Sequence, residues 1–188
     1  MNRPAVGSDV GGKRPQNGFS ERAPIFRFAA VFGLQLTAFY ALVLIPWFQS
    51  AYYGYLCLNA RLLALLVNIF GANASASGVT VRSGAYAVAI QRGCDAIEPS
   101  WFFCAAVLAY PAPWRSKPKA LLFGVAIVQA LNDLRFLTLY YTGMWSPRFF
   151  GFAHLELWPV LFIMTCLSLW ITWIRSAGSL RKLPDHDE

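Results

Sequence analysis

The chain has 188 residues, of which 57% are hydrophobic and 13% are charged, and its formal net charge is +7. A soluble domain carries about 25% charged residues, so the composition excludes an ordinary soluble enzyme and indicates a polytopic membrane protein. Each crossing takes about 20 residues, which leaves room for one membrane domain only. Because Lys and Arg flank apolar runs and form no basic stripe with interleaved aromatics, we expect no nucleic-acid partner.

The first predicted element is a flexible basic cytoplasmic tail over residues 1–27, where Gly, Pro, Ser and Arg are frequent and no apolar period is present. The uncharged run from Phe28 to Phe48 follows and predicts a transmembrane helix. Pro46, Trp47 and the tyrosines beyond them are typical of an aromatic belt at a membrane interface. A signal sequence is the alternative for this run, although the run is longer than the apolar core of a signal peptide.

The next apolar run, residues 51–70, contains two asparagines and one arginine. It predicts either a second span or a helix along the outer membrane surface, and hydropathy leaves both open. Apolar residues then alternate between Gly78 and Ile90 around Arg82-Ser83-Gly84, which predicts a short β-hairpin. Because an open hairpin has unpaired backbone groups, it must lie in water or against the helices.

Three further runs are long and apolar enough to form helices: Pro99 to about Pro111, Ala120 to Tyr141, and Leu155 to Ile174. Pro99 suits the first turn of a helix, where its missing N–H needs no partner. The sequence therefore predicts an all-α polytopic membrane bundle of four to five transmembrane helices, with a short outer-face β-hairpin before Cys94. We expect residues 28–175 to form the membrane domain and residues 176–188 to form a polar cytoplasmic tail.

The positions of Lys and Arg predict the orientation of the chain. Eleven of them lie in the two tails and the turn around Trp114, whereas four lie in the segment 49–95 and the loop 140–156. Since positive charge favours the cytoplasmic side, both termini are expected in the cytoplasm. An even number of crossings follows, and four are obtained if residues 51–70 stay on the outer face. The hairpin, Cys94 and the loop 140–156 then face outward.

Cys94 is the most unusual of the four cysteines. The other three lie in apolar runs, where a free cysteine is a small buried hydrophobe, but Cys94 stands between Gly93 and Asp95. Its thiolate is a nucleophile, and the carboxylates of Asp95 and Glu98 disfavour that thiolate unless an arginine neutralises them. The four cysteines show neither a zinc spacing nor an obvious disulfide framework.

Arg135 is a charged residue within the apolar helix predicted at 120–141, where a charge is costly in free energy. An ionisable group at membrane depth indicates a functional site, and snorkelling to the headgroups is the alternative. Arg135 lies 16 residues beyond Lys119, the predicted inner boundary, and this separation is about 24 Å along a helix. In a hydrocarbon core roughly 30 Å thick, Arg135 therefore reaches the level of Cys94.

Two other polar residues of this helix and one histidine complete the candidate site. Asn132 shares a helical face with Arg135 by i, i+3 spacing, whereas Asp133 points elsewhere. His154 stands at the start of the last predicted helix, on the outer side, although a lone histidine is more often structural. A thiol, a guanidinium and an imidazole thus converge from three parts of the chain. These groups suit acyl transfer from a peptide bond, because a thiolate attacks, an imidazole moves protons and a cation stabilises an oxyanion.

The order of these residues resembles the exosortase/archaeosortase family of membrane cysteine transpeptidases, and most closely its compact exosortase H type. The resemblance covers roughly residues 71–173, with a cysteine ahead of an apolar helix, then Asn132-x-x-Arg135, then a histidine before the last helix. It implies that Cys94 is the nucleophile, Arg135 the essential cation and His154 the third catalytic residue. Asn132 would support Arg135.

The resemblance also implies a location and a substrate. The location is a bacterial inner membrane, with the active site facing the periplasm or exterior. The substrates are exported proteins with a C-terminal sorting tail, made of a short motif, a transmembrane helix and a basic cluster, which are cut at the motif and passed to a surface acceptor. The usual Cys-Ser/Thr-Gly start is replaced here by Cys94-Asp95-Ala96. Glu98 and Asp133 are further candidates for substrate-binding or supporting residues.

Two other classes of function are compatible with the sequence. A small transporter or channel would line a polar path with Gln129, Asp133 and Arg135, and Cys94 would be incidental. A structural assembly factor would need none of these side chains for chemistry. The sequence has no metal-binding cluster, no phosphate-binding glycine loop and no Gly-x-Ser-x-Gly, so we expect neither a metal nor a cofactor.

Overall fold

The computed structural model describes residues 18–84 and 86–180, and helices make up most of this part of the chain. The elements in chain order are α1 (Gly18–Val43), α2 (Pro46–Ile69), β1 (Ser75–Ser77), β2 (Thr80–Ser83), β3 (Tyr86–Ala89), α3 (Ile97–Ala109), a 3₁₀ turn (Trp114–Ser116), α4 (Lys117–Trp145), α5 (Pro147–Phe152), a π-helical turn (Ala153–Leu157) and α6 (Trp158–Leu180). The predicted combination of apolar helices with a short β element is confirmed.

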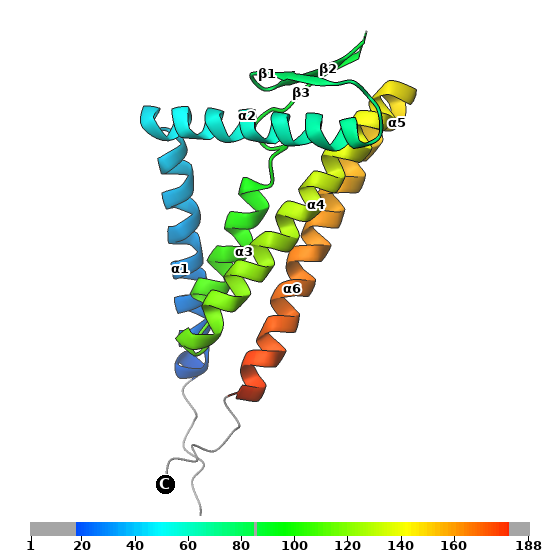
Figure 1. Ribbon diagram of the computed structural model, residues 1–188. Coiled ribbons are helices and arrows are strands. Elements are labelled where there is room, and N and C mark those ends of the chain that lie inside the picture. Colours follow the sequence, from blue (N-terminus) through cyan, green and yellow to red (C-terminus); the bar gives the residue numbers. More distant parts are fainter. Residues whose placement is uncertain (1–17, 85, 181–188) are drawn as a thin grey trace, which may run out of the picture.

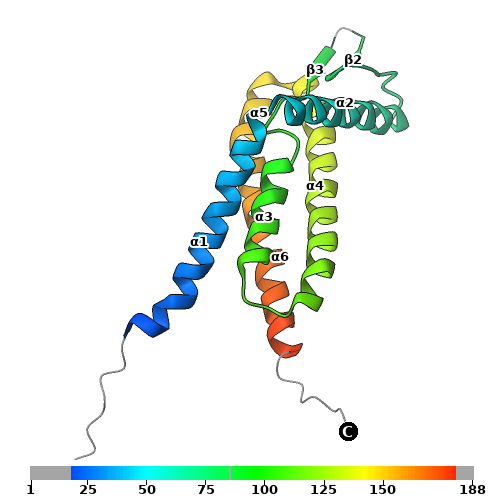
Figure 2. The same ribbon diagram turned by 90° about the vertical axis from the view of Figure 1, so that its left-hand side faces the viewer.

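Four helices stand side by side, and a fifth lies across one of their ends. α1, α3, α4 and α6 form the upright set, and α2 crosses it with the small sheet beyond (Figure 1). The view turned by 90° shows the same crosswise α2 (Figure 2). α3 is central because it packs against α1, α4 and α6. The start of α1 and the end of α6 lie at the end opposite to the sheet.

Among the described residues, four segments are long and apolar enough to cross a membrane, by length and composition: Pro24–Val43, Pro46–Ile69, Trp114–Trp145 and Pro147–Ala177. α3 is also apolar but has 13 residues, which span about 20 Å. α2 has the length of a membrane span, yet it runs across the upright helices. This crosswise direction is the one that the surface-helix alternative for residues 51–70 requires.

The boundary between α1 and α2 differs from the predicted one. The run Phe28 to Phe48 was expected to form one helix, but α1 ends at Val43 and α2 begins at Pro46. Proline suits the first turn of a helix and disfavours helical backbone in the residue before it. Ile45 is accordingly extended, with φ −77° and ψ 126°. The chain therefore changes direction within a continuous apolar run.

The ends of the bundle also extend beyond the predicted domain boundaries. α1 begins at Gly18, within the range 1–27 that was expected as a flexible tail, because Glu21, Arg22 and Ala23 are good helix formers. α6 continues to Leu180, past the expected boundary at residue 176. The remaining predictions for the two tails concern residues 1–17 and 181–188, which lie outside the described residues.

The predicted hairpin is present and is extended by a third strand. β2 pairs with β3 in antiparallel register, with Thr80 opposite Ala89, and β1 pairs with the other edge of β2, with Ser75 opposite Arg82. Gly78 and Gly84 stand in the two turns with φ +57° and +56°, a region that glycine adopts without steric cost. β1 was missed because its sequence, Ser-Ala-Ser, carries no apolar alternation.

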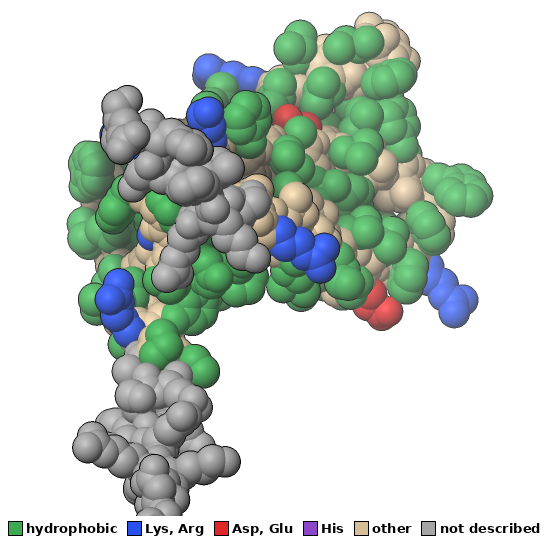
Figure 3. All heavy atoms as spheres, turned by 90° about the horizontal axis from the view of Figure 1, so that it is seen from below, with side chains coloured by type: hydrophobic (Ala, Val, Ile, Leu, Met, Phe, Trp, Pro, Cys, Tyr) green, Lys and Arg blue, Asp and Glu red, His purple; other side chains and the backbone are tan. Residues whose placement is uncertain are grey.

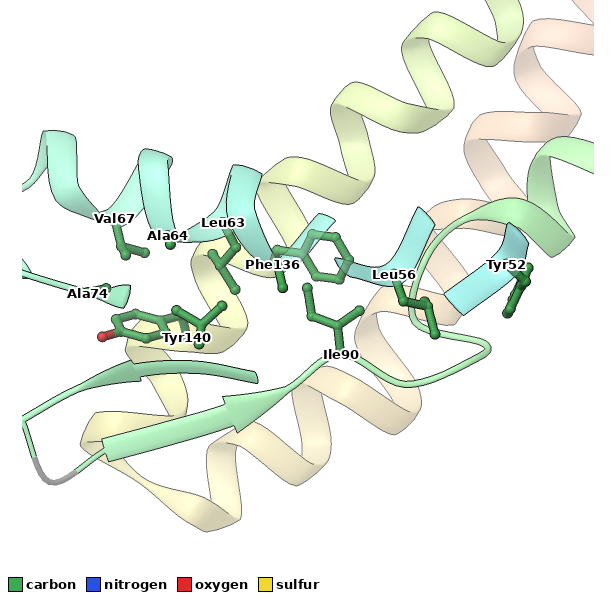
Figure 4. Packing of buried hydrophobic residues seen from close by; sticks show 11 residues of the cluster. Tyr52, Leu56, Leu63, Ala64, Val67, Ala74, Ile90, Phe136 and Tyr140 are labelled. Atoms are coloured by element: carbon green, nitrogen blue, oxygen red, sulfur yellow. The ribbon is translucent and has the colours of Figure 1, made fainter. Parts of the chain in front are cut away.

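A buried apolar cluster joins α2, the sheet and α4, and it fixes the loop that carries Cys94. Figure 4 shows Leu63 of α2 close to Phe136 of α4, and Leu56 of α2 on the side of Ile90, within one buried cluster that also contains Tyr140. Ile90 follows β3 directly and is 3% exposed. Because it is held in the core, the next residues of the loop are kept close to α4.

The sheet is also docked on α4 through a close contact at Gly143. The hydroxyl of Tyr86 occupies the space where a side chain at residue 143 would begin. The ring of Tyr86 also lies edge-on to Tyr140, with centroids 5.4 Å apart. A glycine at this position therefore allows the strand β3 to lie against the end of α4.

Candidate active site

Cys94 lies in the turn between β3 and α3, and its neighbours hold this turn in a defined shape. The Cys94 N–H donates to the carbonyl of Gln91 at 3.1 Å. Ala96 has φ +58° although it is not a glycine, and such a backbone is uncommon outside turns and functional sites. The carboxylate of Asp95 accepts the N–H of Ile97, the first residue of α3, at 3.0 Å and so closes a local turn ahead of the helix. The turn thus places the thiol at the end of α3 that faces the sheet.

The structure brings the three predicted site residues together. Cys94 Sγ lies 3.7 Å from His154 Nε2. Arg135 Nη2 lies 3.9 Å from Cys94 Sγ and 3.4 Å from His154 Nδ1. The thiol comes from the turn after β3, the guanidinium from α4 and the imidazole from the π-helical turn. Cys94 and His154 are separated by 60 residues of sequence.

A π-helical turn presents His154 to the thiol. α5 begins at Pro147, with the Ser146 side chain accepting the N–H of Phe149 at 3.4 Å. The helix then widens over Ala153–Leu157 before α6 continues, and such π-turns are frequently found at functional sites. The imidazole of His154 stacks on Phe150, with ring centroids 5.5 Å apart and planes 13° apart. This stacking limits the orientations that the imidazole can take.

The thiol of Cys94 is half-buried, and burial is the largest influence on its ionisation. Burial raises the pKa of Cys94, the positive charge of Arg135 lowers it, and the carboxylate of Asp95 raises it. The balance lies above the ordinary value for cysteine, so the resting group is a protonated thiol. The Asp95 carboxylate thus acts on the thiol in the direction expected from the sequence. A base would be needed to form a thiolate from this group at neutral pH.

Arg135 is a buried cation, and not all of its N–H groups have a hydrogen-bond acceptor. Its side chain is 6% exposed, and its guanidinium lies 5.6 Å from the centre of the Phe162 ring. Its Nε is buried and has no hydrogen-bond partner among the described residues. No carboxylate in the described part of the chain hydrogen-bonds to this guanidinium. Because a buried cation without a full set of partners is costly, the site favours an added acceptor such as a carbonyl oxygen.

The remaining predicted residues lie near the site without direct contact with its three groups. Asn132 is fully buried one turn before Arg135, and neither atom of its amide has a partner within the described residues. Glu98 lies in the first turn of α3, and Asp133 is half-buried on α4. In the described structure neither carboxylate hydrogen-bonds to Cys94, Arg135 or His154.

Sequence reasoning missed a polar network that anchors the cysteine turn. The hydroxyl of Tyr55 on α2 lies 3.0 Å from the carbonyl of Asp95 and 3.0 Å from Gln129 Oε1 on α4. Gln129 in turn donates to the hydroxyl of Ser100 on α3 at 3.4 Å. Arg92 lies over the ring of Tyr52, 5.2 Å from its centre. Gln129 could be recognised in the sequence as a polar residue within an apolar helix. Tyr55 was missed because it was interpreted as part of an aromatic belt at the membrane interface.

Comparison with protein-family models, curated proteins and solved structures finds no match for this chain. The described residues contain no cluster of His, Cys, Asp or Glu that could hold a metal ion. The fold and the site together define an apolar helical bundle with a thiol, an imidazole and a guanidinium in contact at one end. The chemistry of this site has to be inferred from those groups.

Proposed function

We propose that the chain is a membrane-embedded cysteine peptidase/transpeptidase of the exosortase type. It cleaves the C-terminal sorting signals of exported proteins through a thioacyl-enzyme intermediate. The observation that carries the proposal is the 3.7 Å separation of Cys94 Sγ from His154 Nε2, with Arg135 Nη2 3.9 Å from Sγ and 3.4 Å from His154 Nδ1. A nucleophile beside a base, with a fixed cation next to both, is the arrangement that covalent acyl transfer uses.

The membrane placement is proposed on the length and direction of the helices. α1, α4 and α6 contain apolar segments of membrane length, and they stand parallel to the shorter α3. The end with the basic Trp114 turn is assigned to the cytoplasm, because positive charge favours that side. The thiol and the sheet then face the outer side, and α2 lies along the outer surface with Trp47, Leu58 and Ile69 exposed.

The first half of the reaction forms a thioester on Cys94. The transfer uses the tautomer of His154 that carries its proton on Nδ1, with the Arg135 N–H groups directed at the substrate carbonyl. The thiol proton then passes to the free Nε2 as sulfur attacks the carbonyl carbon of the scissile peptide bond. The carbonyl oxygen becomes an oxyanion, and Arg135 donates to it with N–H groups that have no full set of partners. The C–N bond then breaks, and the proton on Nε2 moves to the leaving amine. The positive charge of Arg135 beside Nδ1 disfavours a lasting imidazolium, which promotes this second transfer.

The second half of the reaction releases the product from Cys94. An acceptor amine, or water in simple hydrolysis, attacks the thioester carbon while His154 Nε2 takes its proton. Arg135 again stabilises the oxyanion, and the C–S bond breaks. The sulfur leaves as a thiolate that takes the proton from Nε2, which restores the thiol and the neutral imidazole.

The transporter alternative is less well supported. It required Gln129, Asp133 and Arg135 to line one polar path. Gln129 instead contacts Tyr55 and Ser100, and Asp133 makes no hydrogen bond to Arg135 in the described structure. The thiol would also be incidental in a transporter, yet it is in contact with two functional groups.

Co-expression with an exported reporter that carries a sorting tail tests the proposal. We expect the wild-type chain to shorten the reporter, and Cys94→Ala to abolish this processing. Cys57→Ala is the matched control, because Cys57 is another free, half-buried cysteine. Normal processing by Cys94→Ala would refute the peptidase proposal.

A further inference from the structure

A cleft of about 880 Å³ opens between α4 and α6 at the end of the bundle opposite Cys94. Its walls are mainly apolar and include Phe123 and Ile127 of α4 and Leu169 of α6. Phe123 is 64% exposed and Ile127 is 44% exposed. Apolar surface of this kind on a concave face is typical of a ligand-binding site. The proposed catalytic residues do not line it.

The rim of the cleft is basic. Arg115 and Lys119 both line it, and they lie four residues apart across the start of α4. The hydroxyl groups of Ser116 and Thr172 stand in the same lining, and none of the lining residues is acidic. Figure 3 views the molecule from this end and shows Lys and Arg side chains standing among apolar ones. The cleft thus joins positive charge at its rim to an apolar interior.

The basic rim and the apolar walls together indicate which kind of ligand fits the cleft. A free inorganic anion would pair with the rim but would leave the apolar walls without a partner. A peptide helix that ends in a basic cluster would be repelled by Arg115 and Lys119. A phospholipid with an anionic headgroup satisfies both parts, because its phosphate faces the rim and its acyl chain covers the walls. Basic pockets between membrane helices on the cytoplasmic side bind such headgroups.

We propose that the cleft between α4 and α6 binds one anionic phospholipid, with the phosphate at Arg115 and Lys119 and an acyl chain along Phe123, Ile127 and Leu169. The site rests on the membrane placement given under the proposed function but not on the thiol chemistry. Because α4 carries Arg135 at its other end, the lipid would hold the helix that supplies the cation of the proposed active site.

The test is a lipid titration of the full-length chain in a non-ionic detergent, read by native mass spectrometry. The probes are dioleoyl phosphatidylglycerol and dioleoyl phosphatidylcholine, which share acyl chains and differ in net charge. We expect the wild-type chain to bind one phosphatidylglycerol at least about tenfold more tightly than phosphatidylcholine. Removing both charges with Arg115→Gln and Lys119→Gln should weaken phosphatidylglycerol binding by about 30-fold. Phosphatidylcholine binding should weaken by less, because choline offsets the charge of its phosphate, so the preference for phosphatidylglycerol should be lost.

Two matched controls separate this cleft from general charge and general apolar surface. Arg61→Gln with Arg148→Gln removes two exposed cations outside the cleft, and it should keep the phosphatidylglycerol preference. Ile127→Trp fills the cleft and should weaken both lipids, whereas Ile163→Trp adds the same side chain at an exposed position outside it. Circular dichroism of each variant identifies any that fails to fold.

Equal binding of the two lipids by the wild-type chain would overturn the proposal. An unchanged preference in the variant that lacks Arg115 and Lys119 would also overturn it. So would a loss of lipid binding in the control variants, Arg61→Gln with Arg148→Gln and Ile163→Trp, as large as in the cleft variants that they match. The titration contains no peptide substrate, so its outcome is independent of whether Cys94 is a nucleophile. A failed lipid site and a failed peptidase proposal therefore give different results.

Discussion

Replacing Arg135 by methionine should make Cys94 a much poorer nucleophile. The guanidinium lies 3.9 Å from Cys94 Sγ, and at an effective dielectric constant of 20 this separation corresponds to about 4 kcal/mol of attraction for a thiolate. That energy equals a change of about 1000-fold in the thiolate fraction at fixed pH. Because Cys94 is half-buried, water screens part of the attraction. We therefore expect a decrease of at least about tenfold.

The assay is the rate of alkylation of Cys94 by iodoacetamide, followed by mass spectrometry of the Cys94 peptide across pH. Burial raises the pKa of Cys94. The alkylation rate of the wild-type chain should therefore rise with pH and reach half its maximum at a pH above the pKa of free cysteine. Arg135→Met should move this midpoint to still higher pH, because the thiolate loses a stabilising cation. Methionine is apolar, so it leaves no unpaired charge in the site.

Arg148→Met is the matched control for charge, because Arg148 is an exposed arginine near the same end of the bundle. It should alter the alkylation rate of Cys94 by less than about twofold, since water and salt screen the charge of an exposed side chain. If Arg135→Met and Arg148→Met give the same midpoint as the wild-type chain, the guanidinium does not act on the sulfur and the electrostatic reasoning is wrong.

Three further variants probe the site and its support. His154→Gln should reduce processing of a tail-bearing reporter by about 100-fold or more, because the proton-transfer group is lost. Gly143→Ala should lower the melting temperature, since its Cβ would overlap the hydroxyl of Tyr86. Adding Tyr86→Phe should restore part of the loss, because Cζ of residue 86 and Cδ2 of Phe150 would still lie 3.0 Å and 3.2 Å from the new Cβ. Gly33→Ala, with open space around its Cβ, should not lower the melting temperature. Asn132→Leu should raise the free energy of unfolding by about 1 kcal/mol, because it removes two unpartnered buried polar atoms.

Each of these variants has an outcome that contradicts its rationale. Processing by His154→Gln at the wild-type rate would remove the imidazole from the mechanism. If Tyr86→Phe does not raise the melting temperature of Gly143→Ala, the hydroxyl is not the obstructing group. A loss of stability in Asn132→Leu would show that the amide has partners such as ordered water.

The relative level of Arg135 and Cys94 along the bundle could be predicted from the sequence because helix geometry is regular. The rise per residue placed Arg135 near the level of Cys94, and in the structure the two side chains are in contact. Helical periodicity likewise separated Asn132 from Asp133, and only Asn132 is fully buried. These inferences needed only the spacing of residues along one helix.

Features that depend on contacts between distant segments could not be read from the sequence. The direction of α2 is set by the turn at Pro46 and by packing of Leu63 against Phe136 and Tyr140, whereas its hydropathy is that of a membrane span. The π-helical turn around His154 has no sequence signature. The role of Tyr55 also required coordinates, because its partner Asp95 lies 40 residues away.

The central claim is that Cys94 forms a thioester with the processed substrate. The most direct measurement is the intact mass of the full-length chain, recorded after a short reaction with a tail-bearing substrate and an acid quench. We expect an added mass equal to that of the substrate fragment that precedes the cleavage site, less one water, because the fragment is attached as an acyl group. This added mass should map to Cys94, disappear on treatment with hydroxylamine, and be absent from Cys94→Ala. Processing of the substrate without any adduct on Cys94, or with the adduct retained in Cys94→Ala, would contradict the claim.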